Sequence, residues 1–246
     1  MKPVSSLRAQ HQKLHMPALG ILALDTSFPR IPGDVGCAGT FAFPVRYETV
    51  AGATVAALVH RDDEHLLQPF IAAGRKLAAA GCIGIGTTCG FLCRWQQALA
   101  TALPVPVLTS ALVQLPAIEP MLPRGLRAGV VTYSAADLTP ETLTAAGAKP
   151  DTPVAGVAPD GYFARTIREG RATLDRARMS ADVVAAARKL VHDHRGIGAI
   201  VLECANMPPY RAAVARAVGL PVFDAVSLID WFYSALNRPR HPVDRV

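Results

Sequence analysis

Short apolar runs alternate along the chain with longer stretches in which hydrophobic residues recur at helical spacing. The short runs end in small or polar residues and predict strands over 20–25, 45–50, 82–87, 105–111, 127–134, 152–158, 198–206 and 220–226. The longer stretches predict helices over 62–81, 90–103, 161–194, 208–219 and 227–237, and a further helix that starts at Thr139 and Pro140. Strands that alternate with helices throughout predict an α/β fold with mainly parallel sheets.

The second part of the chain repeats the order of elements in the first. Pro106 follows Cys89 by 17 residues, and Pro221 follows Cys204 by 17 residues as well. Each cysteine ends an apolar run, precedes an alanine-rich helical segment, and is followed by a strand that starts with Pro-Val. The opening strands also correspond, as "GILALDTS" in one part and "AGVVTYSA" in the other. These matches predict two pseudo-symmetric, Rossmann-like α/β domains.

We divide the chain accordingly. The first domain is expected to comprise residues 18–116 plus 221–246 and to carry Cys89, and the second to comprise residues 117–220 and to carry Cys204. Ligands of parallel α/β sheets bind beyond the carboxyl ends of the strands, where both cysteines fall. The active site is therefore expected in the cleft between the domains.

A long loop follows the first predicted strand. Residues 26–44 are rich in proline and glycine, and a loop of this length in a compact domain is commonly functional. The loop directly follows a strand end where substrate is expected, and its glycines permit movement. We expect it to act as a lid or as a wall of the cleft.

The two matched cysteines suggest acid–base chemistry. Each lies just before a predicted helix, whose free amides and dipole stabilise an anion. A thiol in this position is expected to ionise below its ordinary pKa of about 8.5. Two such thiols that face one cleft from opposite domains have the geometry required to remove a proton from one face of a carbon and return one to the other.

Composition narrows the classes of partner. The chain is 51% hydrophobic with a formal net charge of +6, and its basic residues are scattered without an arginine-rich run or an aromatic ladder. We therefore expect an anionic small-molecule substrate and no nucleic acid. The first residues have no apolar signal region, and the longest apolar runs are far short of a membrane span. These features predict a cytoplasmic protein with reduced thiols and no membrane partner, and they are compatible with a homo-oligomer.

The segments around the cysteines resemble a known family. "TTCGFL" and "LECANMPPY", together with "LDTSFPR" and "VVTYSA", are similar to the aspartate/glutamate racemase superfamily over roughly residues 18–236. That superfamily contains racemases of amino acids that work without pyridoxal phosphate, hydantoin racemases, maleate isomerases and arylmalonate decarboxylases. The resemblance implies that one cysteine acts as thiolate base and the other as thiol acid, with no cofactor and no metal.

The resemblance also implies which residues form the site. Cys89 and Cys204 are the expected catalytic pair. The residues expected to bind the substrate are Asp25, Thr26, Thr87, Thr88, Gly90, Thr132, Tyr133, Ser134, Glu203, Ala205 and Asn206.

The sequence departs from the family pattern at both cysteines. The second motif of typical racemases is Gly-Cys-Thr, whereas here Cys204 lies between Glu203 and Ala205. Thr88 precedes the first cysteine, where many racemases have asparagine. Glu203 is expected either to form a salt bridge with an arginine such as Arg30 or Arg46, or to be a polar group in the cleft.

We therefore predict a cofactor-independent isomerase that inverts a carbon alpha to a carboxylate, as in aspartate, glutamate or a related compound. Retention of both cysteines favours racemisation over decarboxylation. A cis–trans isomerase of the maleate type and a hydantoin racemase are the alternatives within the family. A two-lobed binding protein without catalytic activity is the alternative outside it.

Overall fold

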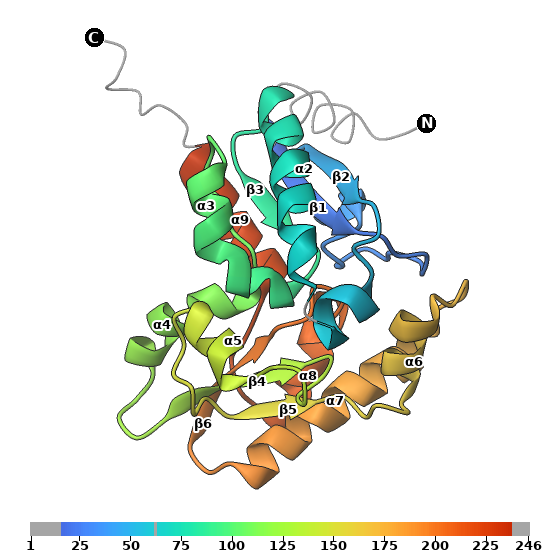
Figure 1. Cartoon of the computed structure of the whole chain (residues 1–246). Coiled ribbons are helices and arrows are strands. Elements are labelled where there is room, and N and C mark those ends of the chain that lie inside the picture. The colour runs from blue at the N-terminus through green and yellow to red at the C-terminus, as the bar shows by residue number, and fades with distance from the viewer. Residues whose placement is uncertain (1–15, 62, 238–246) are drawn as a thin grey trace, which may run out of the picture.

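The computed structural model describes residues 16–61 and 63–237, which form two stacked α/β halves (Figure 1). The first half contains a sheet of order β2-β1-β3, and the second half contains a sheet of order β5-β4-β6-β7. All the paired strands are parallel, as the sequence predicted. The strands are β1 (Leu19–Leu24), β2 (Val45–Val50), β3 (Ile85–Thr87), β4 (Arg127–Thr132), β5 (Val154–Gly156), β6 (Ile197–Leu202) and β7 (Val222–Asp224).

The two halves share one strand topology. In each half the first strand lies in the middle, the second pairs on one side of it and the third on the other. β7 pairs with β6 at the outer side of the second sheet, and Val107 forms a single parallel bridge with Ile85 at the equivalent place in the first. This order confirms the predicted pseudo-symmetric α/β fold.

Helices surround both sheets. Those of the first half are α2 (Leu67–Ala79) and α3 (Gln96–Ala102), and the short α4 (Leu115–Ile118) leads to the second half. The second half contains α5 (Pro140–Ala145), α6 (Tyr162–Glu169), α7 (Arg176–Asp193) and α8 (Arg211–Val218), and α9 (Ala225–Leu236) closes the described chain. Short segments of 3₁₀ helix are η1 (Ala38–Thr40), η3 (Glu64–Leu66), η4 (Gly90–Trp95), η5 (Ala111–Gln114), η6 (Glu119–Met121) and η7 (Pro208–Tyr210), and η2 (Ala56–His60) is a π-helical turn.

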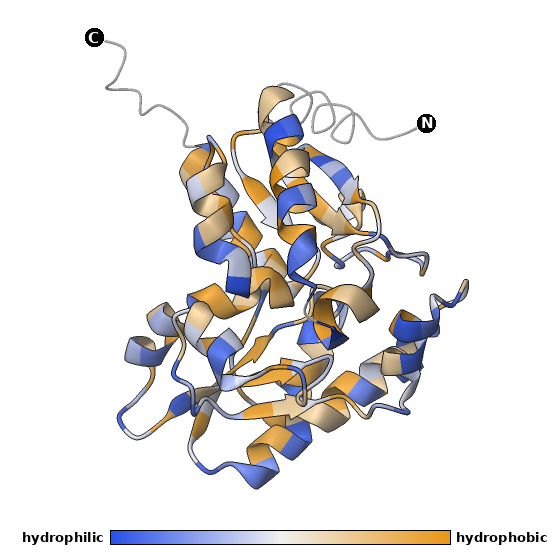
Figure 2. Cartoon of the chain, viewed as in Figure 1, coloured by the Kyte–Doolittle hydropathy of each residue, from blue (hydrophilic) through white to orange (hydrophobic). Residues whose placement is uncertain are grey.

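The sequence explains these elements. The central strand β6 is buried at every position, as expected for a parallel strand covered on both faces, whereas the edge strand β2 carries hydrophilic residues, coloured blue in Figure 2. The long helix α7 buries Met179, Val183 and Leu190 on one face. Thr139 caps α5, and Pro140 occupies its first turn, so this predicted helix start is confirmed. Within residues 16–61 and 63–237, no helix is long and apolar enough to cross a membrane.

Several segments differ from the sequence predictions, as three examples show. The predicted strand 105–111 is reduced to the single bridge at Val107. The predicted helix 90–103 is split into the 3₁₀ segment η4 and the α-helix α3. The chain was expected to return to the first half at residue 221, but it does so only after β7, because β7 is hydrogen-bonded to β6.

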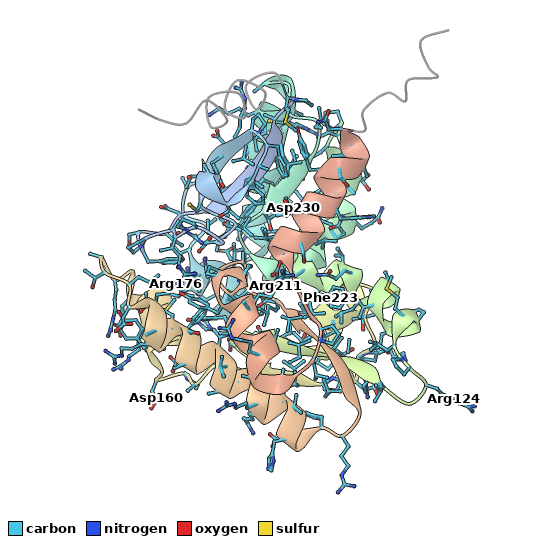
Figure 3. The ribbon with its side chains drawn as sticks, turned by 180° about the vertical axis from the view of Figure 1, so that it is seen from behind. Arg124, Asp160, Arg176, Arg211, Phe223 and Asp230 are labelled. Carbon is cyan, nitrogen blue, oxygen red and sulfur yellow. The ribbon has the colours of Figure 1, made fainter. Side chains whose placement is uncertain are left out.

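Helix α9 makes this return. Its Tyr233 ring stacks on Phe43 with the ring centroids 3.6 Å apart, and its hydroxyl donates to the carbonyl of Pro17 at 2.8 Å. Seen from behind, α9 runs along the first half, whereas Phe223 of β7 lies near the junction of the halves (Figure 3). Asp224 forms a capping box with Ser227 and so starts α9 at this junction. The junction therefore places both strand-end cysteine loops against each other.

Candidate active site

Cys89 lies just beyond the end of β3, at the start of η4. The buried Thr87 hydroxyl donates to the carbonyl of Thr109 at 2.5 Å and to that of Cys89 at 3.1 Å. The backbone N–H of Thr88 donates to Leu22 of the central strand β1 at 3.0 Å. These bonds tie the cysteine loop to its sheet, and the Cys89 residue is only 8% exposed.

Cys204 occupies the matching position in the second half, after β6 and Glu203. Its thiol donates to Oδ1 of Asn206 at 3.5 Å, and its carbonyl accepts from the N–H of Met207 at 2.9 Å. Cys204 is more exposed than Cys89. The two cysteines therefore have equivalent places in the fold but different surroundings.

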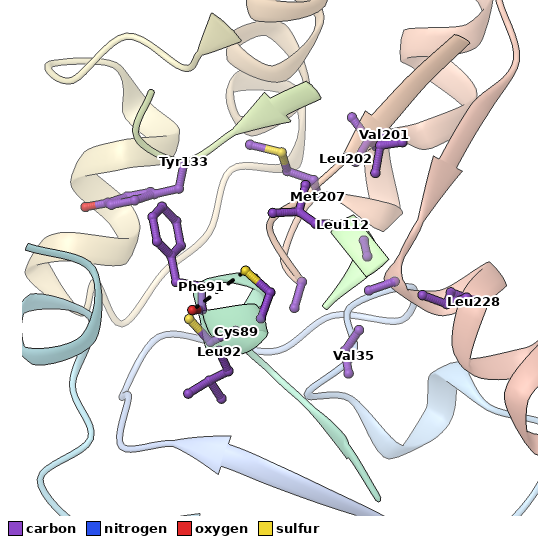
Figure 4. Close-up of a cluster of buried hydrophobic side chains, with 14 of the residues drawn as sticks. Val35, Cys89, Phe91, Leu92, Leu112, Tyr133, Val201, Leu202, Met207 and Leu228 are labelled. Atoms are coloured by element: carbon purple, nitrogen blue, oxygen red, sulfur yellow. Dashed lines mark hydrogen bonds between the residues drawn. The ribbon is translucent and has the colours of Figure 1, made fainter. Parts of the chain in front are cut away.

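Both cysteines line one small cavity of about 30 Å³ between the halves. This volume holds a water molecule or two but no substrate, so the walls have to part for a substrate to enter. Figure 4 shows Cys89 and Phe91 of the first half close to Tyr133 of the second. The lining residues are Leu24, Val55, Val59, Thr88, Cys89, Gly90, Phe91, Tyr133, Ile167, Glu203, Cys204 and Asn206.

Glu203 is a buried carboxyl group beside the two thiols, with only 1% exposure. Its Oε2 accepts a hydrogen bond from Thr132 at 2.8 Å, whereas its Oε1 has no hydrogen-bond partner among the described residues. Arg30 forms its salt bridge with Asp34 and not with Glu203. Of the two roles expected for Glu203, a salt bridge or a polar group in the cleft, the structure therefore shows the second. Burial raises the pKa of Glu203 to about 7, against the lowering effect of its hydrogen bonds with Thr132 and Tyr133.

The expectation of acidic thiols is wrong for this arrangement. Burial, reinforced by the charge of Glu203, raises the pKa of Cys89 to about 12, although the N–H groups of Phe91 and Leu92 act in the opposite direction. The same two causes, in the same order, raise the pKa of Cys204 well above its ordinary value. The amides of a short 3₁₀ segment do not offset the effects of burial and of a neighbouring carboxylate on the pKa of Cys89.

Gly90 is required for this packing. A Cβ atom on Gly90 would lie 2.6 Å from the carbonyl oxygen of Glu203 and still closer to its Oε1. We expect Gly90→Ala to lower the free energy of unfolding by about 1–3 kcal/mol, because the backbone of Glu203 has to shift. Chemical denaturation measures this loss. Gly39→Ala is the matched control, because its Cβ would approach nothing closer than the sulfur of Cys37 at 3.7 Å; an equal loss in the control would contradict the prediction.

The 26–44 loop contacts both halves of the molecule, but none of its residues lines the cysteine cavity. The N–H of Val35 donates to the carbonyl of Ala205 at 3.2 Å, directly after Cys204. Asp34, only 3% exposed, accepts from Nδ2 of Asn206 at 2.7 Å. Arg30 donates to Asp34 at 3.2 Å and to Thr26 at 2.8 Å, and it therefore holds the loop rather than reaching into the cysteine cavity.

A larger cavity of about 380 Å³ adjoins the cysteine cavity and shares Val55 and Ile167 with it. Its polar lining includes His60 and Arg168. The expected substrate residues Asp25 and Thr26 lie here, outside the lining of the cysteine cavity.

Other expected residues support the site from outside. Thr87 fixes the first cysteine loop, and Thr132 donates to Glu203. Ser134 donates to Asp137 at 2.5 Å, and neither Ser134 nor Ala205 is in the lining of the cysteine cavity.

Several residues in and around the cavity gave no signal in the sequence. Asp34 lies in an irregular loop, and only its burial against Asn206 distinguishes it. Val55, Phe91 and Ile167 look like ordinary core residues until the fold brings them to the cleft. Among the described residues, no group of three or more histidine, cysteine or acidic side chains lies close enough together to hold a metal ion.

Comparison with known proteins identifies the family. The Asp/Glu/Hydantoin racemase family matches residues 72–229, and the chain belongs to this family of enzymes. Dimethylsulfoniopropionate lyase 7 of Emiliania huxleyi (strain CCMP1516) is 30% identical over 241 residues, which are 93% of this chain and 70% of the lyase. Lyase 5 of the same organism is 32% identical over 241 residues, again 93% of this chain but only 47% of the lyase, so the chain spans about half of that relative.

Solved structures agree on the fold. A double mutant of arylmalonate decarboxylase in a liganded form superposes with a TM-score of 0.65 at 15% identity, covering 92% of this chain and 94% of the decarboxylase. The chain thus belongs to a racemase family, is similar in sequence to lyases, and shares its fold with a decarboxylase, so the isomerase reaction expected from the sequence does not follow from these similarities alone.

Proposed function

We propose that this enzyme removes a proton from a carbon alpha to a carboxylate, with Cys89 as the base, in the cavity that Cys89 and Cys204 share. The observation that carries this proposal is that two cysteines from equivalent strand ends line one cavity beside a buried carboxyl group. A thiol that becomes a thiolate in such a cavity is a general base within reach of a small bound substrate. The proposal uses only groups of this chain.

The reaction we favour is β-elimination from a sulfonium carboxylate, with dimethylsulfoniopropionate as the first substrate to test. The relatives at 30% and 32% identity support it. So does Glu203, because its Oε1, which has no hydrogen-bond partner among the described residues, would attract a sulfonium cation. The same oxygen would repel the second carboxylate of a dicarboxylate such as aspartate or glutamate. A bound cation would also lower the pKa of Cys89, opposing the effect of Glu203.

The elimination balances without a co-reactant. The thiolate of Cys89 takes the proton from the carbon alpha to the carboxylate. The electron pair of that C–H bond forms the new double bond, and the bond from the β carbon to sulfur breaks with its electron pair leaving on dimethyl sulfide. The products are acrylate, dimethyl sulfide and a Cys89 thiol, which returns its proton to the solvent before the next cycle.

Racemisation is the second candidate. It is favoured by the origin of the two cysteines in opposite halves, which suits removal of a proton from one face of a carbon and delivery to the other. In that reaction the S–H bond of Cys204 would break as its proton forms the new C–H bond on the opposite face, and the original C–H bond would be the only substrate bond to break.

Proton NMR separates the candidates. With dimethylsulfoniopropionate we expect the vinyl signals of acrylate to appear in proportion to enzyme. In deuterated water, single enantiomers of aspartate, glutamate and hydantoins test for loss of the alpha-proton signal together with loss of optical rotation. Turnover of an enantiomer without elimination would select racemisation, and absence of both reactions across the panel would contradict the proposed function.

A further inference from the structure

A chain of hydrogen bonds links the 26–44 loop of the first half to the thiol of the second. Oδ1 of Asp34 accepts from the N–H of Gly36 at 2.6 Å and from Arg30 at 3.2 Å. Oδ2 of Asp34 accepts from Nδ2 of Asn206 at 2.7 Å. Oδ1 of Asn206 in turn accepts from the thiol of Cys204 at 3.5 Å.

The orientation of the Asn206 amide follows from Asp34. A carboxylate can only accept hydrogen bonds, so the nitrogen of the amide has to face Asp34. The oxygen of the amide is then left for Cys204, where it accepts from a thiol and repels a thiolate. Both sides of the amide are thereby determined by one buried carboxylate.

We propose that Asp34 is a positioning residue that acts through Asn206 to hold Cys204 as the protonated, proton-donating member of the pair. The inference rests on the proposed function only where it calls Cys204 a proton donor, since the hydrogen bonds themselves exist without substrate. It also makes the two cysteines unequal. The sulfur of Cys89 is approached by the backbone N–H groups of Phe91 and Leu92, which favour its thiolate. The sulfur of Cys204 is approached by one such group, the backbone N–H of Asn206, but its thiol also donates to the side-chain oxygen of Asn206.

Other charged and titratable groups surround Cys204, and the test has to separate their effects from that of Asn206. They come from each element packed around the thiol: Glu203 on its own strand end, Cys89 from the first half, Asp34 and Arg30 from the loop, and Tyr133 and Tyr210 from the second half.

An isosteric substitution reverses the amide. In Asp34→Asn, the single remaining side-chain oxygen of residue 34 stays on the side of Gly36 and Arg30, since both already donate to Oδ1. The new amide nitrogen then faces Asn206, which has to rotate and present its own nitrogen to Cys204. A donor in place of an acceptor favours the thiolate, so we expect the apparent pKa of Cys204 to fall by about one unit.

The measurement is the rate of iodoacetamide alkylation of Cys204 at pH 8, followed by peptide mass spectrometry on the folded protein. We expect alkylation about tenfold faster in Asp34→Asn than in the wild type, with Cys89 in the same digest as internal reference. Asn206→Leu provides the second background. In the Asn206→Leu protein, Asp34→Asn removes the same negative charge, but the side-chain amide of residue 206 that would rotate is absent. We therefore expect a much smaller acceleration of Cys204 alkylation.

Equal accelerations in both backgrounds would overturn the proposal, because Asp34 would then act by its charge alone. No acceleration in either would overturn it as well. If Asp34→Asn does not fold, Asn206→Leu alone tests the last link: the thiol loses its acceptor, so alkylation of Cys204 is expected to accelerate, and an unchanged rate would contradict the role of Asn206. These assays contain no substrate, so absence of turnover would remove the proposed function and leave this result standing.

Discussion

Replacing Cys89 with serine is expected to reduce proton abstraction by about 10²–10⁴-fold, the range of a general base. A serine hydroxyl is far less acidic than a thiol and does not form the required base in this cavity. The substitution is close to isosteric, so the packing of Phe91 and Tyr133 around the cavity is kept. Initial rates of acrylate formation, or of alpha-proton exchange with deuterated water, measure the loss.

Cys93→Ser is the matched control. Cys93 is also buried and only four residues away, but its sulfur lies 3.6 Å from the carbonyl oxygen of Thr142, and Cys93 is not in the lining of the cavity. We expect the Cys93→Ser protein to keep its activity. Cys204→Ser then separates the reactions, since elimination needs no proton returned to carbon and should survive, whereas racemisation needs both thiols and should not. Full activity of Cys89→Ser would contradict its role as base.

Glu203→Gln is expected to change the pH dependence of stability. The pKa of Glu203 is about 7 in the folded protein and close to the ordinary value of 4.5 in the unfolded chain. The folded state therefore binds more protons between these values, and the free energy of unfolding of the wild type falls as pH rises through this window. Relative to Glu203→Gln, the fall should amount to about 3 kcal/mol, because 1 pKa unit corresponds to about 1.4 kcal/mol.

Urea denaturation of both proteins at intervals from pH 4.5 to 8 measures this difference. The Glu203→Gln substitution introduces an amide that has no obvious partner for one N–H, so the comparison uses the change with pH and not the absolute stability. Glu64→Gln, at an exposed position, controls for loss of a negative charge, and its curve is expected to run parallel to that of the wild type. Parallel curves for Glu203→Gln and the wild type would contradict the prediction, because they would show that ionising Glu203 in the folded protein costs no free energy.

Much of the fold could be predicted from the sequence because local pattern and global topology agree. β2 occupies the predicted residues 45–50, and the equal spacing after Cys89 and Cys204 corresponds to equivalent strand orders. The predicted strand 105–111 failed because the chain pairs with β3 only at Val107: the N–H of Thr109 donates to the side chain of Gln96, and Ser110 caps η5, and no local pattern records these contacts.

The site was less predictable. The two cysteines could be found because symmetry distinguishes them from filler, but their pKa values depend on how closely the two halves pack. Asp34 could not be found, because its importance comes from a contact with Asn206 that is 172 residues away in the chain. Asp25 and Thr26 fell in the adjoining cavity, since the chain turns away from the cysteines directly after β1.

The 26–44 loop also limits how the enzyme can open. Its bonds from Val35 to Ala205 and from Asp34 to Asn206 cross from one half to the other. A separation of the halves that breaks these bonds releases the amide of Asn206 and with it the protonation preference of Cys204. A separation of the halves that opens the cavity would therefore also remove the hydrogen bond that keeps Cys204 protonated. Entry past Val55 and Ile167, the wall shared with the larger cavity, leaves the bonds of the loop intact and admits a substrate to a site that is already set for reaction.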